Sequence, residues 1–157
     1  MSDSATWDLP SPHVIALTVT PEDMDAYNHV NNAVYLTWFD RVAWDHSAAL
    51  GLPLARCLEL DRGMAVVRAV VTYLRAALLG NTLSVATWLV PSSGKLTAVR
   101  RFQVRRSDDE DTLARAEVTY ACIELSSGRP TRWPTEFRER YIPQSDVVAA
   151  YAGIAPL

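Results

Sequence analysis

The sequence lacks the long hydrophobic runs and paired cysteines that mark membrane and secreted proteins. Arginine or aspartate interrupts each apolar stretch well before the 18 residues that a membrane-spanning helix needs. The first twelve residues, MSDSATWDLPSP, contain no hydrophobic signal core. Cys57 and Cys122 form no C-x-x-C pair, so we expect two buried, reduced thiols. These absences predict a cytoplasmic protein without membrane association.

The chain also lacks an excess of positive charge, a glycine-rich phosphate loop and a zinc-binding spacing of histidines. Its formal net charge is −3, which argues against a general nucleic-acid binder. Gly94 is isolated, and His13, His29 and His46 fit no standard metal pattern, so neither a metal nor an organic cofactor is expected. With 157 residues, 49% of them hydrophobic, the chain has the size and composition of one globular domain.

The hydrophobic pattern predicts one long helix among β-strands. Apolar residues recur at spacings of three and four from Tyr35 to Leu50, and they spread around most of that helix, which we therefore expect to be buried. Gly80-Asn81 is a hairpin signal between two β-rich runs. The expected strands are 13–19, 64–79, 82–91, 95–106 and 112–125, followed by short helices at 134–141 and 147–151.

This order predicts an α+β fold in which an antiparallel meander of five to six strands wraps around one central helix. We expect a flexible segment at 1–12, a single domain at 13–143 and a C-terminal tail at 144–157. A single sheet of long Val- and Leu-rich strands leaves two edges unpaired. Pairing with a second copy would remove that problem, so the sequence predicts a homodimer or homotetramer.

The segment Asp25 to Asn32 holds one carboxylate, one imidazole and three carboxamides within eight residues, directly before the predicted helix. The pattern Asp25-x-x-Asn28-His29-Val30-Asn31-Asn32-x-x-Tyr35 resembles the D-x-x-G-H-V-N-N-x-x-Y signature of hot-dog-fold acyl-CoA thioesterases. The most similar group is the 4-hydroxybenzoyl-CoA thioesterase-like branch. The likeness extends over about residues 13–141 and includes Tyr73-Leu74-Arg75 and Gly128-Arg129-Pro130.

The resemblance implies a catalytic role for Asp25, either as the nucleophile or as the general base that activates water. It also implies that the backbone N–H of Asn32 stabilises the oxyanion at the start of the helix. His29 either takes part in the chemistry by polarising the carbonyl or orienting water, or holds the loop. A turn-capping role is the structural alternative for Asp25.

Tyr27, Asn28, Asn31 and Tyr35 are the other motif residues that the resemblance places near the substrate. Asn28 occupies a position where glycine is usual, and asparagine is the next most tolerant residue of a left-handed backbone. Asn31 is also a preferred helix N-cap, and both roles are compatible. Tyr35 lies either under the acyl group or in the core.

Arg100, Arg101 and Asp40 each allow two interpretations. Arg100 and Arg101 belong to the densest cationic region, which either holds the phosphates of coenzyme A or forms a solvated strand face. Asp40 is expected to pair with Arg41 or to be exposed. The predicted activity is hydrolysis of an acyl-CoA thioester, with coenzyme A as part of the substrate. The alternatives are an acyl-carrier-protein thioesterase and a non-catalytic acyl-thioester-binding protein.

Overall fold

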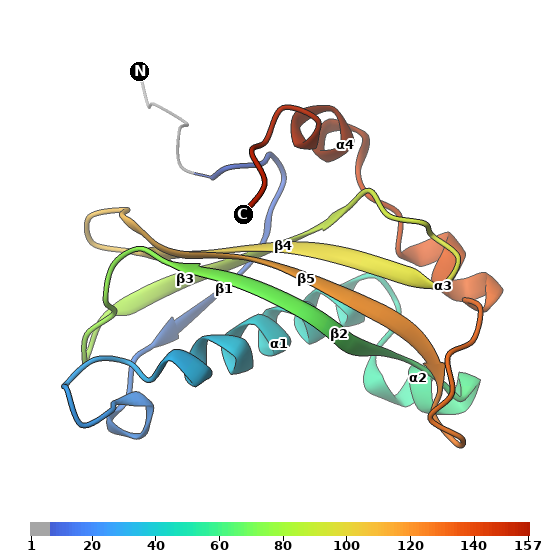
Figure 1. Cartoon of the computed structure of the whole chain (residues 1–157), viewed down its shortest axis with the longest axis horizontal. Coiled ribbons are helices and arrows are strands. Elements are labelled where there is room, and N and C mark those ends of the chain that lie inside the picture. Colours follow the sequence, from blue (N-terminus) through green and yellow to red (C-terminus); the bar gives the residue numbers. More distant parts are fainter. Residues whose placement is uncertain (1–6) are drawn as a thin grey trace.

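The computed structural model describes residues 7–157 and shows one five-stranded antiparallel sheet with a long helix across one face (Figure 1). The strands are β1 (His13–Thr18), β2 (Arg62–Tyr73), β3 (Thr82–Val90), β4 (Thr97–Arg106) and β5 (Thr112–Glu124). The helices are η1, a 3₁₀ turn (Pro21–Asp23), α1 (Asn32–Ala49), α2 (Leu54–Leu60), α3 (Thr135–Arg140) and α4 (Ser145–Tyr151). The strand order is β1-β3-β4-β5-β2.

The connection between β2 and β3 differs from the predicted hairpin. β2 pairs with β5 at one edge of the sheet, whereas β3 pairs with β1 and β4. Gly80 does form a turn, with φ +81°, but this turn brings the chain beside the end of β1, where the Val19 amide donates to the Asn81 carbonyl. The predicted meander is therefore wrong for the connection between β2 and β3, because a turn signal does not specify which strands pair.

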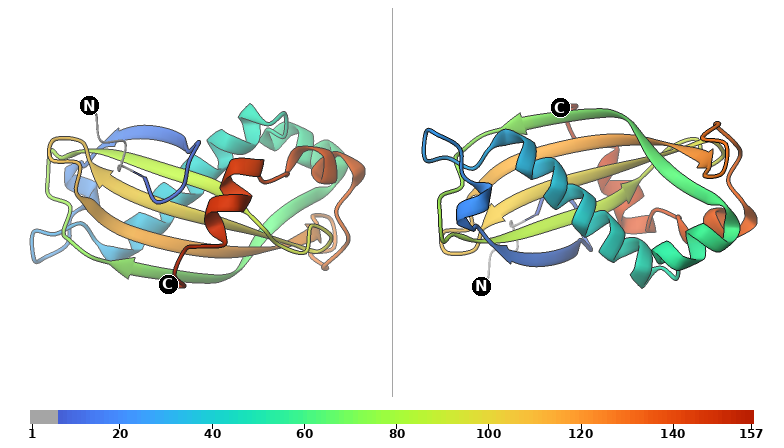
Figure 2. Two further views of the ribbon diagram at one scale, coloured as in Figure 1. Left: turned by 90° about the horizontal axis from the view of Figure 1, so that it is seen from above. Right: turned by 90° about the horizontal axis from the view of Figure 1, so that it is seen from below.

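α1 packs on the sheet through the side chains that the spacing selects. Phe39 packs against Phe102 of β4 with the ring centroids 4.8 Å apart and the rings tilted by 34°, and Val42 is fully buried. Figure 2 shows α1 crossing one face of the sheet obliquely. We expected α1 to be buried on most sides. This is wrong for the side of the helix that carries Leu36 and Trp44, which remain 45% and 41% exposed.

The opposite face of the sheet is covered by the two ends of the described chain. Trp7 packs edge-on against Trp88 of β3, and the Trp88 indole donates to the carbonyl of Pro10. Leu9 and Val147 of α4 join the same buried cluster. A flexible segment was predicted at 1–12. Residues 1–6 lie outside the described residues, whereas residues 7–12 pack against the sheet. The predicted tail likewise contains α4, which lies over the sheet (Figure 2) and buries Val147.

The described residues therefore form the hot-dog arrangement that the resemblance predicted, a sheet curved around one long helix. β1 and β2 are the sheet edges, and β2 leaves Val66 and Val67 largely exposed. Cys57 and Cys122 are buried free thiols, as predicted. Within residues 7–157, no helix has the length and hydropathy needed to span a membrane.

Candidate active site

The loop before α1 is held together by the Asp25 carboxylate. Its Oδ1 accepts hydrogen bonds from the backbone amides of Tyr27, at 2.8 Å, and His29, at 3.1 Å. The Asp25 amide donates in turn to the His29 carbonyl. Asn28, between them, has φ +59°, which confirms the predicted left-handed turn. One carboxylate oxygen thus builds the turn, while Oδ2 forms no hydrogen bond within residues 7–157.

Asn31 sets the start of α1. Its side-chain oxygen accepts from the Ala33 amide at 3.0 Å, and its own amide donates to the Asp23 carbonyl, so the predicted N-cap is confirmed. Asn32 is the first helical residue. Its N–H finds no acceptor in the described part of the chain, as expected for the first turn of a helix. An unsatisfied N–H at the positive end of the helix dipole is a ready donor to an anion.

A shallow groove of about 220 Å³ borders this helix start. Its lining consists of His29, Val30, Asn32, Tyr35, Tyr73, Leu74, Arg75 and Ala76. His29 and Asn32 thus share one groove, whereas the Asp25 side chain lies in the adjoining loop. Tyr27 is 82% exposed and lies outside the groove.

Two tyrosines form the wall of the groove beside the helix. Tyr35 is buried and meets Tyr73 edge-on, with 5.2 Å between the ring centroids, so it is both a core residue and part of the groove. The Tyr73 hydroxyl donates to the Asn32 carbonyl at 2.8 Å. Burial raises the pKa of Tyr73, which therefore remains a neutral donor at pH 7.

The sequence patterns assigned no role to Tyr73 or Arg75, although both stand in the Tyr-Leu-Arg landmark of the resemblance. Arg75 is exposed at the groove and forms an ion pair with Asp111 at 2.8 Å. Period-two alternation places such residues on a strand but does not indicate which loop the strand end meets. The sequence pattern does not show that the end of β2 contacts the start of α1, which is what places Tyr73 and Arg75 at the groove.

Arg100 and Arg101 do not form a cationic surface. Both are buried, and they face opposite sides of β4 because successive strand residues alternate. Arg101 is paired with Glu117 at 2.6 Å, and Arg100 contacts α1 through Ser47. The solvated strand face is therefore wrong for this pair, whereas a contact of Arg100 or Arg101 with the phosphates of coenzyme A stays a prediction. Asp40 is exposed and has no ion pair with Arg41 among residues 7–157.

No group of three or more His, Cys, Asp or Glu side chains in the described residues is arranged to hold a metal ion. The groups gathered at the helix start are a carboxylate with one free oxygen, an imidazole, a free backbone amide and a phenol. This set can supply a nucleophile or base and can stabilise an oxyanion, which are the needs of acyl transfer from an activated carbonyl.

Two acyl-CoA thioesterases have sequences similar to this chain over most of their length. Long-chain acyl-CoA thioesterase FadM of Escherichia coli is 27% identical over 121 residues, covering 74% of this chain and 87% of that protein. Acyl-CoA thioesterase YbgC of Haemophilus influenzae is 29% identical over 121 residues, covering 76% of this chain and 87% of that protein.

Solved structures show the same fold. Slr0204, a 1,4-dihydroxy-2-naphthoyl-CoA thioesterase from Synechocystis, superposes with a TM-score of 0.74 at 17% identity, covering 83% of this chain and 96% of that one. The family model of the thioesterase-like superfamily matches residues 19–141, which include the Asp25 loop, α1 and all strands after it. The chain is therefore a member of the thioesterase-like superfamily.

Proposed function

We propose that this protein hydrolyses acyl-CoA thioesters to a free carboxylic acid and coenzyme A. The proposal depends on two features near the start of α1: the Asp25 carboxylate in the loop directly before the helix, and the unsatisfied N–H of Asn32 at its first position. Membership of the thioesterase-like superfamily and the similarity to FadM and YbgC support the substrate class.

In the proposed reaction the thioester carbonyl lies in the groove with its oxygen at the Asn32 N–H. Either Asp25 Oδ2 attacks the carbonyl carbon, or it removes a proton from a water that attacks. The new C–O bond forms a tetrahedral oxyanion, which the helix-terminal amide stabilises. Collapse of this intermediate breaks the C–S bond, and the thiolate of coenzyme A leaves. In the nucleophilic route, water then hydrolyses the anhydride on Asp25.

The tyrosine wall gives the oxyanion donor its orientation. The hydrogen bond from Tyr73 to the Asn32 carbonyl fixes the first peptide of α1 from outside the helix. The Asn31 side chain fixes the same turn from its N-terminal side. A donor that is already oriented needs no reorganisation as charge develops in the transition state.

We also propose that the protein acts as a homodimer or homotetramer. β2 is an edge strand with unpaired backbone groups, and its Val66 and Val67 side chains are 56% and 60% exposed. Exposed apolar edges promote association, and pairing with a second copy would satisfy both the backbone and the apolar surface.

The decisive experiment is the substitution Asp25→Asn. Turnover of an acyl-CoA panel is measured as the release of free thiol. We expect it to fall by at least about 1000-fold while acyl-CoA still binds, since the amide is neither nucleophile nor base. Asp23→Asn is the matched control, because Asp23 only caps the preceding turn through Thr20. Activity of Asp25→Asn within a few-fold of wild type would refute the assignment.

The same assay separates the alternatives. Matched acyl-CoA and acyl-carrier-protein thioesters compare the two carriers directly. Thiol release from no substrate, with binding intact, would indicate a binding protein. Single-turnover hydrolysis in ¹⁸O-labelled water tests the nucleophilic route, because label enters Asp25 only when water attacks the aspartyl carbon of the anhydride.

A further inference from the structure

Arg75 is the cation of the groove at the start of α1. Among the described residues that line this groove, it alone carries a permanent charge, and its side chain is 65% exposed. It lies two residues beyond Tyr73, the last residue of β2, whose hydroxyl donates to the Asn32 carbonyl. Arg75 and the proposed oxyanion donor therefore border the same groove.

Arg106 adds a second positive charge beside this end of the groove. Its side chain, 19% exposed, donates from Nη2 to the carbonyl of Ala76 at 3.1 Å and from Nε to Asn81 Oδ1 at 3.3 Å. Ala76 itself lines the groove, next to Arg75. Arg106 is thus held in place by the chain, whereas the exposed guanidinium of Arg75 is free to change partners.

Both arginines pair with the acidic turn between β4 and β5. Arg75 forms an ion pair with Asp111 at 2.8 Å, and Arg106 pairs with Asp109 at 2.6 Å. Asp111 does not line the groove. An exposed ion pair contributes little to stability, whereas a guanidinium binds a phosphate through two parallel, charge-assisted hydrogen bonds. A phosphate can therefore replace Asp111 as the partner of Arg75 with little loss of stability.

The groove is short enough for a coenzyme A thioester to reach both of its ends. Its volume is about 220 Å³, so even a channel only about 4 Å wide and deep, the width of a hydrocarbon chain, would be about 14 Å long. Roughly 13 bonds of about 1.5 Å join the thioester sulfur to the first phosphorus of coenzyme A, and they span up to about 16 Å. Leu74, which is 47% exposed, lies between Tyr73 and Arg75 and offers an apolar contact to this arm. A thioester whose carbonyl lies at Asn32 can therefore place its diphosphate at Arg75.

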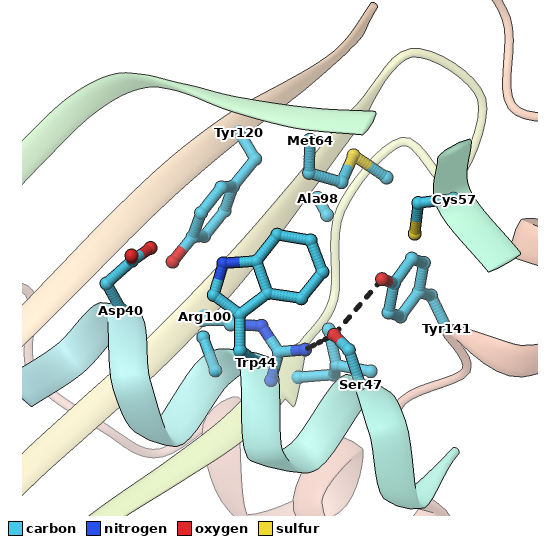
Figure 3. Close-up of a pocket in the computed structure, with 11 residues that line it drawn as sticks. Asp40, Trp44, Ser47, Cys57, Met64, Ala98, Arg100, Tyr120 and Tyr141 are labelled. Atoms are coloured by element: carbon cyan, nitrogen blue, oxygen red, sulfur yellow. Dashed lines mark hydrogen bonds between the residues drawn. The ribbon is translucent and has the colours of Figure 1, made fainter. Parts of the chain in front are cut away.

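Arg100, the buried arginine that faces α1, is less suited to a diphosphate. Its guanidinium bonds to His46 Nδ1 at 2.8 Å and donates to Ser47 Oγ at 3.2 Å (Figure 3). The cavity beside it has about 50 Å³, room for about four waters, whereas a diphosphate has about nine heavy atoms. The Asp40 carboxylate lines the same cavity and would repel an anion (Figure 3). These features favour Arg75.

We propose that Arg75 binds the diphosphate of coenzyme A and that Asp111 holds the guanidinium when the groove is empty. This assignment deepens the proposed thioesterase function and rests on it for the position of the thioester carbonyl. Binding exchanges one anion for another at Arg75, while Arg106 keeps its contacts with Ala76 and Asp109. The diphosphate anchors the far end of the pantetheine arm, so that the thioester at the near end lies beside the Asn32 N–H.

The test compares one acyl group on two carriers, coenzyme A and pantetheine, which share the thioester and differ in the nucleotide and its phosphates. The acyl group is the one that the wild-type protein hydrolyses fastest. We expect Arg75→Met to raise KM for the acyl-CoA by about 10–100-fold with kcat within about 3-fold of wild type, the range of one or two charge-assisted hydrogen bonds. For the acyl-pantetheine, kcat/KM is expected to change by less than about 3-fold. Equal changes for both carriers, or an unchanged KM for the acyl-CoA, would overturn the proposal.

The acyl thioester of dephospho-coenzyme A distinguishes the two phosphate groups, because it keeps the diphosphate but lacks the 3′-phosphate. We expect Arg75→Met to raise KM for this substrate by the same factor as for the acyl-CoA. A loss confined to the substrate with the 3′-phosphate would contradict the diphosphate contact.

Arg138→Met is the matched control, because it removes an exposed arginine from α3, at the opposite end of the sheet from the start of α1 (Figure 1). It is expected to leave the kinetics with both carriers unchanged. A rise in KM for the acyl-CoA as large as that of Arg75→Met would show that net charge, rather than the groove, decides the affinity.

Asp111→Asn provides the opposite test, because it removes the competing anion and leaves Arg75 unpaired. We expect this variant to bind coenzyme A about 2–5-fold more tightly than wild type, the range of an exposed ion pair. Asp108→Asn is its matched control. It makes the same charge change in the same turn, and Asp108 forms no ion pair within residues 7–157. Equal affinities of the two variants for coenzyme A would contradict the exchange.

Calorimetric binding of coenzyme A itself separates this proposal from the proposed function. If the wild-type protein hydrolyses no thioester, the thioesterase function fails, but binding of coenzyme A still tests Arg75. We expect Asp25→Asn to bind coenzyme A, and the double variant with Arg75→Met to bind it about 10–100-fold more weakly. Equal Kd values for these two variants, or no binding by Asp25→Asn, would refute the role of Arg75.

Discussion

At the scale of single residues, Asn28 shows how the Asp25 loop tolerates a departure from glycine. Its φ of +59° lies in the left-handed region, where a β-carbon costs about 1–2 kcal/mol and asparagine is better tolerated than most residues. We expect Asn28→Gly to leave the free energy of unfolding within about 0.5 kcal/mol of wild type, and Asn28→Val to lower it by about 1–2 kcal/mol. Urea denaturation measures both. Equal effects of the two substitutions would show that the turn does not depend on this backbone conformation.

His46 makes the stability of the protein dependent on pH. Burial, Arg100 and the neighbouring His13 lower its pKa from 6.5 to about 3, against a smaller opposing effect of Asp45. Between these pH values the unfolded chain binds a proton that the folded protein excludes, so stability falls as the pH falls below 6.5. The slope is at most about 1.4 kcal/mol per pH unit, and partial exposure of His46 reduces it.

His46→Gln tests this dependence, because the glutamine oxygen can still accept from Arg100 but does not titrate. Urea unfolding at pH 7.5 and pH 5 is expected to show a smaller loss of stability on acidification for His46→Gln than for wild type. An unchanged pH dependence would assign the acid sensitivity to other groups.

At the scale of elements, substitutions at the start of α1 can test the backbone N–H of Asn32 independently of its side chain. Proline is favoured at the first position of a helix, where its missing N–H has no intrahelical acceptor. Asn31, which precedes it, has φ −57° and ψ 130°, a conformation compatible with a following proline. Asn32→Pro should therefore remove the proposed oxyanion donor with little effect on folding.

We expect Asn32→Pro to lower kcat by about 10²–10³ while its melting temperature stays near that of wild type. Asn32→Ala keeps the N–H and is expected to retain activity within about 3-fold of wild type, because the donor is a backbone group. Steady-state kinetics and thermal denaturation of both variants provide the comparison. If Asn32→Ala and Asn32→Pro reduce kcat equally, the side chain of Asn32 rather than its backbone N–H supports turnover.

Local patterns predicted the elements better than the connections between them. The N-cap at Asn31 and the strand alternation on β4 depend on neighbours in the sequence, and both are seen. The pairing of β2 with β5 depends on residues far along the chain, which the Gly80 turn signal does not encode. The packing of Trp7 on Trp88 is equally non-local, so a segment expected to be flexible is part of the fold.

The position of Arg100 could have been recognised from the sequence. Ala98, Phe102 and Val104 share one face of β4 by period-two alternation, and Arg100 is in phase with them. The charge of the residue instead predicted either a solvated strand face or a contact with the phosphates of coenzyme A. That no carboxylate of α1 pairs with Arg100 within residues 7–157 is visible only in three dimensions. Asp45 pairs with His13, and Asp40 lines the same cavity as Arg100 without forming an ion pair.

At the scale of the whole molecule, the exposed edge of β2 predicts association. A charged side chain on an edge strand opposes pairing with another edge, so Val67→Lys is expected to shift the particle mass toward that of the 17.4 kDa chain. Val14→Lys places the same charge on the other edge strand, β1, and is expected to leave the mass unchanged if β2 alone forms the interface.

Light scattering coupled to size-exclusion chromatography measures the mass of each variant at assay concentration. A monomeric wild-type protein would exclude the oligomer, and dissociation by Val14→Lys alone would assign the interface to β1. Thiol release measured on the same fractions shows whether the Asp25 and Asn32 pair acts within a single chain. Full activity in a monomeric Val67→Lys would mean that one copy of the helix start and its groove is sufficient for the chemistry.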